Sequence, residues 1–97
     1  MLLIDIMADN CIHCYVSGRV QSVWFRASTQ KKALSLNITG WVKNLADGRV
    51  ELMACGEPQQ LMLFEQWLRQ GPPQARVDNV EIKSIRSQSF TQFDLIM

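Results

Sequence analysis

The sequence predicts an α+β protein, a split βαβ (ferredoxin-like) sandwich with the element order βαββαβ and two helices on one face of an antiparallel sheet. Segments with alternating apolar residues, typical of half-buried strands, are interrupted twice by segments with apolar residues at helical spacing. An Asp-Gly dipeptide between the second and third strand segments indicates a tight hairpin. A short extra strand is expected at the C-terminal end.

The first half of the chain is expected to hold a strand, a loop and a helix. Residues 11–17 alternate between two sides, as a half-buried strand does. The run 17–22 breaks this alternation and predicts a loop. Asn37 can adopt the left-handed conformation that ends a helix. The helix before it is predicted by the spacing of Phe25, Thr29, Ala33 and Leu36.

The second half is expected to hold a hairpin, a helix and two final strands. Asp47-Gly48 forms the hairpin turn. Pro58 is favoured in the first turn of a helix, Gly71 can end one, and Pro72-Pro73 prevents its continuation. The predicted strands cover residues 40–43, 50–55, 77–85 and 90–96, and the predicted helix covers residues 58–70.

The size and charge of the chain exclude several classes of function. Its 97 residues suffice for one domain, expected over 11–97, with residues 1–10 as a frayed N-terminal extension. Lys and Arg total 10 against 9 Asp and Glu, so no nucleic-acid or anionic-membrane partner is expected. No segment approaches the roughly 18 to 20 apolar residues of a membrane span, and no signal peptide is evident. We therefore expect a cytoplasmic protein.

The loop between the first strand and the first helix is the best candidate for chemistry. Backbone N–H groups that lead into a helix N-terminus can bind an anion, and Gly18 gives this loop freedom at its entry. Arg26 falls in the first turn of the helix, where its guanidinium could hold two phosphate oxygens. Taken alone, Arg26 is more often a solvated surface charge, and both readings stay open at this point.

The same region resembles the acylphosphatase family. Residues 16–26 read V-S-G-R-V-Q-S-V-W-F-R, similar to the family run V-x-G-x-V-Q-G-V-x-F-R. The resemblance continues through G-W-V-K-N over residues 40–44, D-G-R-V-E over 47–51, and the approach to the fourth strand over 71–77. It covers about residues 11 to 96 of the chain.

The resemblance implies an acylphosphatase, which hydrolyses carboxyl-phosphate mixed anhydrides without a metal or cofactor. It implies that Arg26 binds the phosphoryl group and that Asn44 orients the attacking water, although an Asn before a hairpin would otherwise be read as turn chemistry. We expect a monomer that acts on a small acyl phosphate, with phosphate or sulfate as competing anions. The phosphoryl group is also expected to bind the backbone amides of Gly18, Arg19, Val20, Gln21, Ser22 and Val23.

Three positions deserve separate expectations. Ser22 replaces a signature glycine, so its Cβ is expected to strain the loop and to weaken catalysis modestly. Trp24 beside the loop could pack against the acyl group of a substrate, or it could cover the sheet edge. We favour the second role. The chain end, residues 95–97, is expected to touch the edge strand more than the site.

The three cysteines are expected to be structural. Cys11 and Cys14 have CxxC spacing, but in a strand they face opposite sides, which argues against a redox or metal pair. In the split βαβ arrangement the first and third strands are antiparallel neighbours, so Cys11 and Cys55 are predicted to lie within reach of a disulfide on the helix-free face. In a reducing cytoplasm the two would stay thiols.

Two functions other than catalysis are compatible with this fold. An RNA-binding platform would expose aromatic residues on the third strand, and Val50 to Cys55 has none. A catalytically weakened anion-binding module is harder to separate from an enzyme, because Ser22 could spare binding while it slows turnover. Assay of acyl phosphate hydrolysis distinguishes the two.

Overall fold

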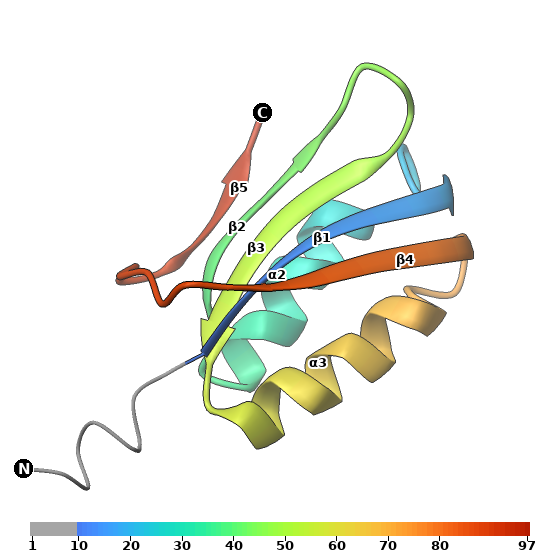
Figure 1. Ribbon diagram of the computed structural model, residues 1–97. Helices are drawn as coiled ribbons and strands as arrows, with labels where there is room; N and C mark the ends of the chain where they lie inside the picture. Colours follow the sequence, from blue (N-terminus) through green and yellow to red (C-terminus); the bar gives the residue numbers. More distant parts are fainter. Residues whose placement is uncertain (1–9) are drawn as a thin grey trace, which may run out of the picture.

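The computed structural model describes residues 10–97, and its elements follow the predicted order (Figure 1). The predicted frayed extension lies outside the described residues, apart from Asn10, which begins the first strand. The elements are β1 (Asn10–Arg19), α2 (Phe25–Ser35), β2 (Thr39–Asn44), β3 (Val50–Gly56), α3 (Pro58–Gln70), β4 (Arg76–Ile85) and β5 (Phe93–Ile96).

The strands form one five-stranded sheet in the order β4-β1-β3-β2-β5. The four long strands pair antiparallel, as the split βαβ arrangement requires. The short extra strand predicted at the C-terminal end is β5, which pairs parallel with β2 at the sheet edge. The segment between Ile85 and Phe93 carries the chain across the sheet, so β5 runs in the same direction as β2 (Figure 1).

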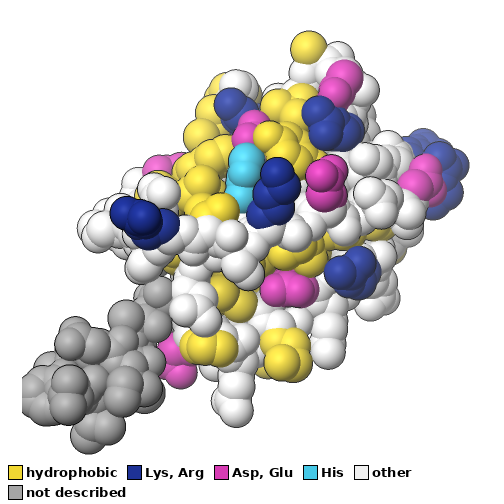
Figure 2. Space-filling view, in the orientation of Figure 1, with side chains coloured by type: hydrophobic (Ala, Val, Ile, Leu, Met, Phe, Trp, Pro, Cys, Tyr) yellow, Lys and Arg dark blue, Asp and Glu magenta, His cyan; other side chains and the backbone are white. Residues whose placement is uncertain are grey.

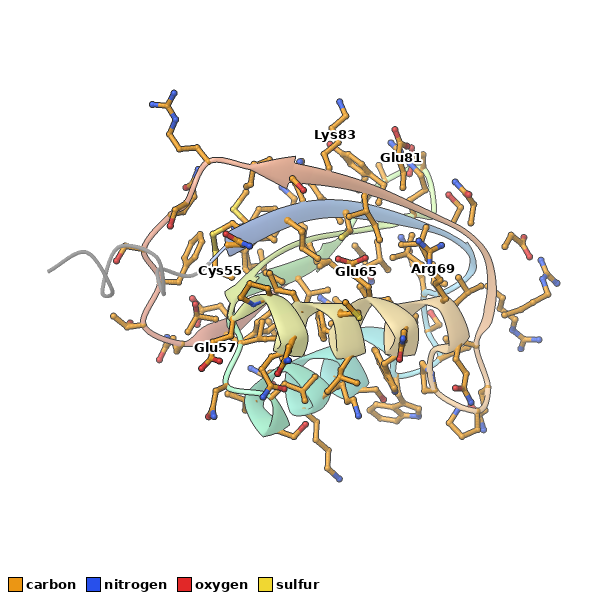
Figure 3. The ribbon with its side chains drawn as sticks, turned by 60° about the horizontal axis from the view of Figure 1, so that its bottom comes forward. Cys55, Glu57, Glu65, Arg69, Glu81 and Lys83 are labelled. Carbon is orange, nitrogen blue, oxygen red and sulfur yellow. A yellow bond between two sulfur atoms is a disulfide. The ribbon has the colours of Figure 1, made fainter. Side chains whose placement is uncertain are left out.

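Both helices cover the same face of the sheet, and the core lies between the two layers (Figures 1 and 3). The predicted helical faces are confirmed, because each helix buries the side chains that recur at its spacing. Asn37 ends α2 with a φ of 57°, and Gly71 ends α3 with a φ of 72°. The buried helix residues are Phe25, Thr29 and Ala33 from α2 and Leu61, Phe64 and Leu68 from α3.

The other face of the sheet carries side chains of both charge signs around His13 (Figure 2). Nε2 of His13 lies 2.7 Å from a carboxylate oxygen of Glu51. Glu81 and Lys83 project from β4 on the side away from the helices (Figure 3). The charges alternate instead of forming a basic stripe, which argues against recognition of a nucleic-acid backbone here. None of the helices within residues 10–97 is long and apolar enough to cross a membrane.

Cys11 and Cys55 face each other across β1 and β3. They are paired residues of the antiparallel ladder, and their Cα atoms lie 4.1 Å apart. The structure joins their sulfurs in a disulfide between two residues that lie 44 positions apart in the sequence. The backbone N–H of Gln88, after β4, donates to Sγ of Cys11 and covers this side of the pair.

Reduction of this disulfide is expected to lower the free energy of unfolding by about 4 kcal/mol, because a loop of this length gains that much conformational freedom in the unfolded chain. Urea unfolding with and without dithiothreitol measures the difference. A variant with both Cys11 and Cys55 replaced by alanine is the control, and its unfolding should not respond to the reductant. Equal stability of the wild-type protein in both conditions would contradict the disulfide.

Cys14, in contrast, faces the core. Burial raises the pKa of its thiol to about 12, so the thiol stays protonated and unreactive at neutral pH. The prediction that Cys11 and Cys14 face opposite sides of β1 is therefore confirmed, and their CxxC spacing forms no dithiol.

Candidate active site

A cavity of about 350 Å³ opens where the loop after β1 meets α2, the end of β2, and β5. Arg26 and Asn44, the two residues predicted to be catalytic, both line this cavity. The other side chains that line the cavity are mostly apolar, so Arg26 and Asn44 supply most of its polar groups. The lining residues are Val20, Ser22, Trp24, Phe25, Arg26, Ala27, Asn44 and Leu95.

Arg26 lies in the first turn of α2, whose free backbone N–H groups give the helix N-terminus a partial positive charge. A cation at this end of a helix is electrostatically unfavourable by itself, and the first turn carries no acidic side chain to offset it. An anion bound here would relieve both effects. The guanidinium is held in place by a 2.7 Å hydrogen bond from Nη1 to the backbone carbonyl oxygen of Ile96 in β5.

Asn44 is the last residue of β2, where it pairs with Val50 just before the hairpin turn. Its Oδ1 is buried and accepts no hydrogen bond from the part of the chain that the structure describes. A buried carbonyl oxygen without a donor costs about 1 to 3 kcal/mol, and a water molecule or a ligand in the cavity would recover that cost. Asn44 therefore offers an acceptor at the cavity wall.

Gln21 connects the loop to the hairpin that carries Asn44. Its Nε2 donates to the carbonyl oxygens of Leu45 and Arg49, at 2.8 and 2.9 Å. These two oxygens belong to the turn directly after Asn44, so one side chain fixes the distance between loop and hairpin. From the sequence, only the backbone amide of Gln21 was expected to contribute, since nothing local to the loop indicates where its side chain reaches.

The other residues whose backbone amides were predicted to bind the phosphoryl group, within 18–23, occupy different environments. Gly18 and Arg19 lie at the end of β1, paired with Val77 and Arg76 of β4 after a register shift. Gly18 has a φ of 128°, and a Cβ there would meet the carbonyl oxygen of Arg76 at 2.1 Å, so only glycine fits. Val20 and Val23 are buried, and Val20 and Ser22 line the cavity.

Ser22 has a φ of 62° in an exposed position. The structure therefore places Ser22 in the left-handed region, in which the Cβ of an L-residue is unfavourable. An L-residue held in this region costs about 1 to 2 kcal/mol relative to glycine, because its Cβ approaches the following carbonyl.

Ser22→Gly is expected to raise the melting temperature by about 4 °C, as about 1 kcal/mol of strain is released, and to raise kcat by a small factor. Thermal unfolding by circular dichroism and steady-state kinetics measure the two quantities. Asn37→Gly is a matched control, because Asn37 also has a positive φ but ends α2 away from the cavity. It should raise the melting temperature slightly and leave kcat unchanged. Lower values of both quantities in Ser22→Gly would overturn the strain argument.

Two expectations about the rim of the site need correction. Trp24 does not cover the sheet edge: it is 76% exposed and lines the cavity. The chain end touches the site directly, through Leu95 in the cavity wall and the Ile96 carbonyl that holds Arg26. The contacts of the chain end follow from the parallel pairing of β5 with β2, which local sequence patterns do not specify.

The donor groups of this region fit an anion better than a cation. Arg26 and the N-terminus of α2 contribute positive charge, and none of the described residues that line the cavity carries a carboxylate. Within residues 10–97 no group of three or more His, Cys, Asp or Glu side chains could hold a metal ion. Fold and site together define a small α+β protein whose main cavity combines an arginine with the positive end of a helix.

Comparison with known proteins assigns the family. The acylphosphatase family profile matches residues 12–95. An acylphosphatase of Coxiella burnetii (strain Dugway) is 52% identical over 85 residues, covering 88% of this chain and 90% of that protein. One from Legionella pneumophila (strain Corby) is 50% identical over 86 residues, covering 89% and 94%. This chain belongs to the acylphosphatase family.

The solved structures agree with this assignment. The structure of an acylphosphatase from Coxiella burnetii superposes with a TM-score of 0.89 at 49% identity, covering 92% of this chain and 94% of that one. The family profile over residues 12–95 includes Arg26, Asn44 and Leu95, which line the cavity.

Proposed function

We propose that this chain hydrolyses acyl phosphates to a carboxylate and inorganic phosphate, with Arg26 and Asn44 as its catalytic residues. The observation that carries the proposal is their convergence on one cavity at the N-terminus of α2. Relatives with about 50% sequence identity are named acylphosphatases, which favours an enzyme over a non-catalytic module of the same fold.

Arg26 is assigned to the phosphoryl group. Phosphoryl transfer passes through a loose transition state in which negative charge spreads over the equatorial oxygens. A guanidinium fixed by the Ile96 carbonyl, together with the amides of the loop and of the first helical turn, would stabilise that charge without reorganising. The leaving group is a weakly basic carboxylate, so its departure requires no general acid.

Asn44 is assigned to the attacking water. Its unpartnered Oδ1 can accept a hydrogen bond from that water and so hold its oxygen toward the phosphorus. The water oxygen forms a bond to phosphorus as the bond from phosphorus to the carboxylate oxygen breaks. A water proton then passes to solvent or to the phosphate product, so Asn44 itself gains and loses no proton.

The proposal is tested by hydrolysis of benzoyl phosphate, followed by its ultraviolet absorbance, with and without a chelator. We expect turnover in both conditions and competitive inhibition by phosphate and by sulfate, which would share the anion site. No turnover would refute the proposed function, and loss of turnover with the chelator would refute a metal-independent site.

The proposal also includes the setting in which the enzyme acts. We propose a monomeric enzyme, because a single chain is sufficient to bring Arg26 and Asn44 to the same cavity. A small acyl phosphate as the substrate and a cytoplasmic location stay predictions, as does the oxidation state of Cys11 and Cys55 in the cell. Size-exclusion chromatography with light scattering measures the oligomeric state directly.

A further inference from the structure

Trp24 is a poor choice for stability at its position. It is the N-cap residue of α2, with a φ of 66°, a region that bulky L-residues rarely adopt. Its side chain makes no capping hydrogen bond, whereas Ser, Asn, Asp or Gly would serve both the cap and the backbone conformation. The side chain is also 76% exposed, so it adds little to the core. The fold therefore gives no reason for an indole here.

The backbone conformation has a consequence for where the indole lies. Val23 and Phe25 on either side are buried, and Trp24 between them faces outward. There it lines the cavity that contains Arg26 and Asn44. A residue kept in a costly conformation beside a site indicates a role at that site more than a role in folding.

The cavity has a polar part and an apolar part. Arg26 and Asn44 supply the polar part, and Trp24, Ala27 and Leu95 supply apolar surface. Its volume of about 350 Å³ lies at the lower end of the range for pockets that hold small organic molecules. A phosphoryl group bound at Arg26 would occupy only a portion of it. The remaining apolar surface matches the acyl part of a substrate.

We infer that Trp24 determines substrate specificity by packing against the acyl group, and that the preferred substrates are acyl phosphates with a planar aromatic or extended apolar acyl group. An exposed indole offers a flat face on which an aromatic ring can stack. A short acyl group such as acetyl reaches little of that face. This inference rests on the proposed function, because it presupposes that Arg26 binds the phosphoryl end.

The test compares benzoyl phosphate with acetyl phosphate as substrates of the wild type and of Trp24→Gly. The readout is the ratio of kcat/KM for the two substrates, because glycine also releases backbone strain and can move both absolute values. We expect the kcat/KM for benzoyl phosphate, divided by that for acetyl phosphate, to fall about 10-fold in Trp24→Gly. The fall should come mainly from a higher KM for benzoyl phosphate. A change of about 10-fold corresponds to the loss of one aromatic stacking contact. Trp24→Phe keeps an aromatic face and should hold the ratio within about twofold.

Leu34→Ala is the matched control. Leu34 is an exposed apolar residue of α2, 57% exposed, that does not line the cavity, and its loss should leave the ratio unchanged. Leu95→Ala removes apolar surface from the cavity by another route and should lower the ratio in the same direction as Trp24→Gly. It keeps the inference testable if Trp24→Gly does not fold.

The outcomes separate this inference from the proposed function. If the wild type hydrolyses both substrates and Trp24→Gly leaves the ratio unchanged, the role of Trp24 is refuted and the function stands. If the wild type hydrolyses neither substrate, the proposed function fails and the specificity role fails with it. Equal losses for the two substrates would identify Trp24 as a general structural element of the site and would also overturn the inference.

Discussion

Arg26→Ala is expected to reduce kcat/KM for acyl phosphates by at least about 10³-fold, the scale seen when an arginine that stabilises a phosphoryl transition state is lost. The substitution removes the cation at the N-terminus of α2, and it also removes the hydrogen bond that the Ile96 carbonyl accepts from Arg26. Phosphate binding should disappear together with turnover. The rise in melting temperature that phosphate causes in the wild type measures that binding without a substrate.

Two further variants show whether the charge or the shape of Arg26 matters. Arg26→Lys keeps the charge but loses the planar pair of donors, so part of the phosphate binding should survive while most of the rate is lost. Lys31→Ala removes an exposed cation from the same helix outside the cavity and should behave as the wild type. Substantial activity in Arg26→Ala would mean that the reaction takes place elsewhere.

Asn44→Ala is expected to lower kcat by about 10²- to 10³-fold, the cost of losing one positioned polar contact in a transition state. Phosphate should still raise the melting temperature, because the anion site at Arg26 is left intact. This separation distinguishes the two roles: Arg26 binds the phosphoryl group and Asn44 orients water. Steady-state kinetics and thermal unfolding with phosphate measure the two effects.

Asn44→Asp tests the assignment further. The side chain keeps its shape, but its negative charge would repel the substrate phosphate, so KM should rise and kcat should fall. Asn79→Ala, at an exposed position of β4, is the control for loss of an amide elsewhere in the sheet. If Asn44→Ala lost phosphate binding as well, Asn44 would belong to the anion site and the division of roles would be wrong.

The four long strands and both helices could be predicted from the sequence because each carries its own local signal. Alternation in β1 and β3, helical spacing in α2 and α3, and Asp47-Gly48 in the turn all depend on residues close in the chain. The pairing of β5 could not be predicted in this way. A four-residue strand at the edge has a weak pattern, and its direction depends on how the preceding segment crosses the sheet.

The family signature names candidate site residues, and their catalytic roles stay predictions. Arg26 and Asn44 are marked by motif and meet at one cavity, and Ser22 has the backbone conformation that its replaced glycine indicates. The side-chain contact of Gln21, the wall formed by Leu95 and the exposure of Trp24 were missed. Each depends on a contact or an orientation that is fixed only when distant segments of the chain are brought together.

The parallel pairing of β2 with β5 has a kinetic consequence. The two strands are separated by about half of the chain, so closing that loop costs more entropy than closing the β2–β3 hairpin, and we expect the β2–β5 pairing to form after that hairpin. Arg26 has its Ile96 acceptor, and the cavity has its Leu95 wall, only after β5 has docked. During refolding, we therefore expect activity to return no earlier than the docking of β5, and a lag of activity behind far-ultraviolet circular dichroism would measure that step.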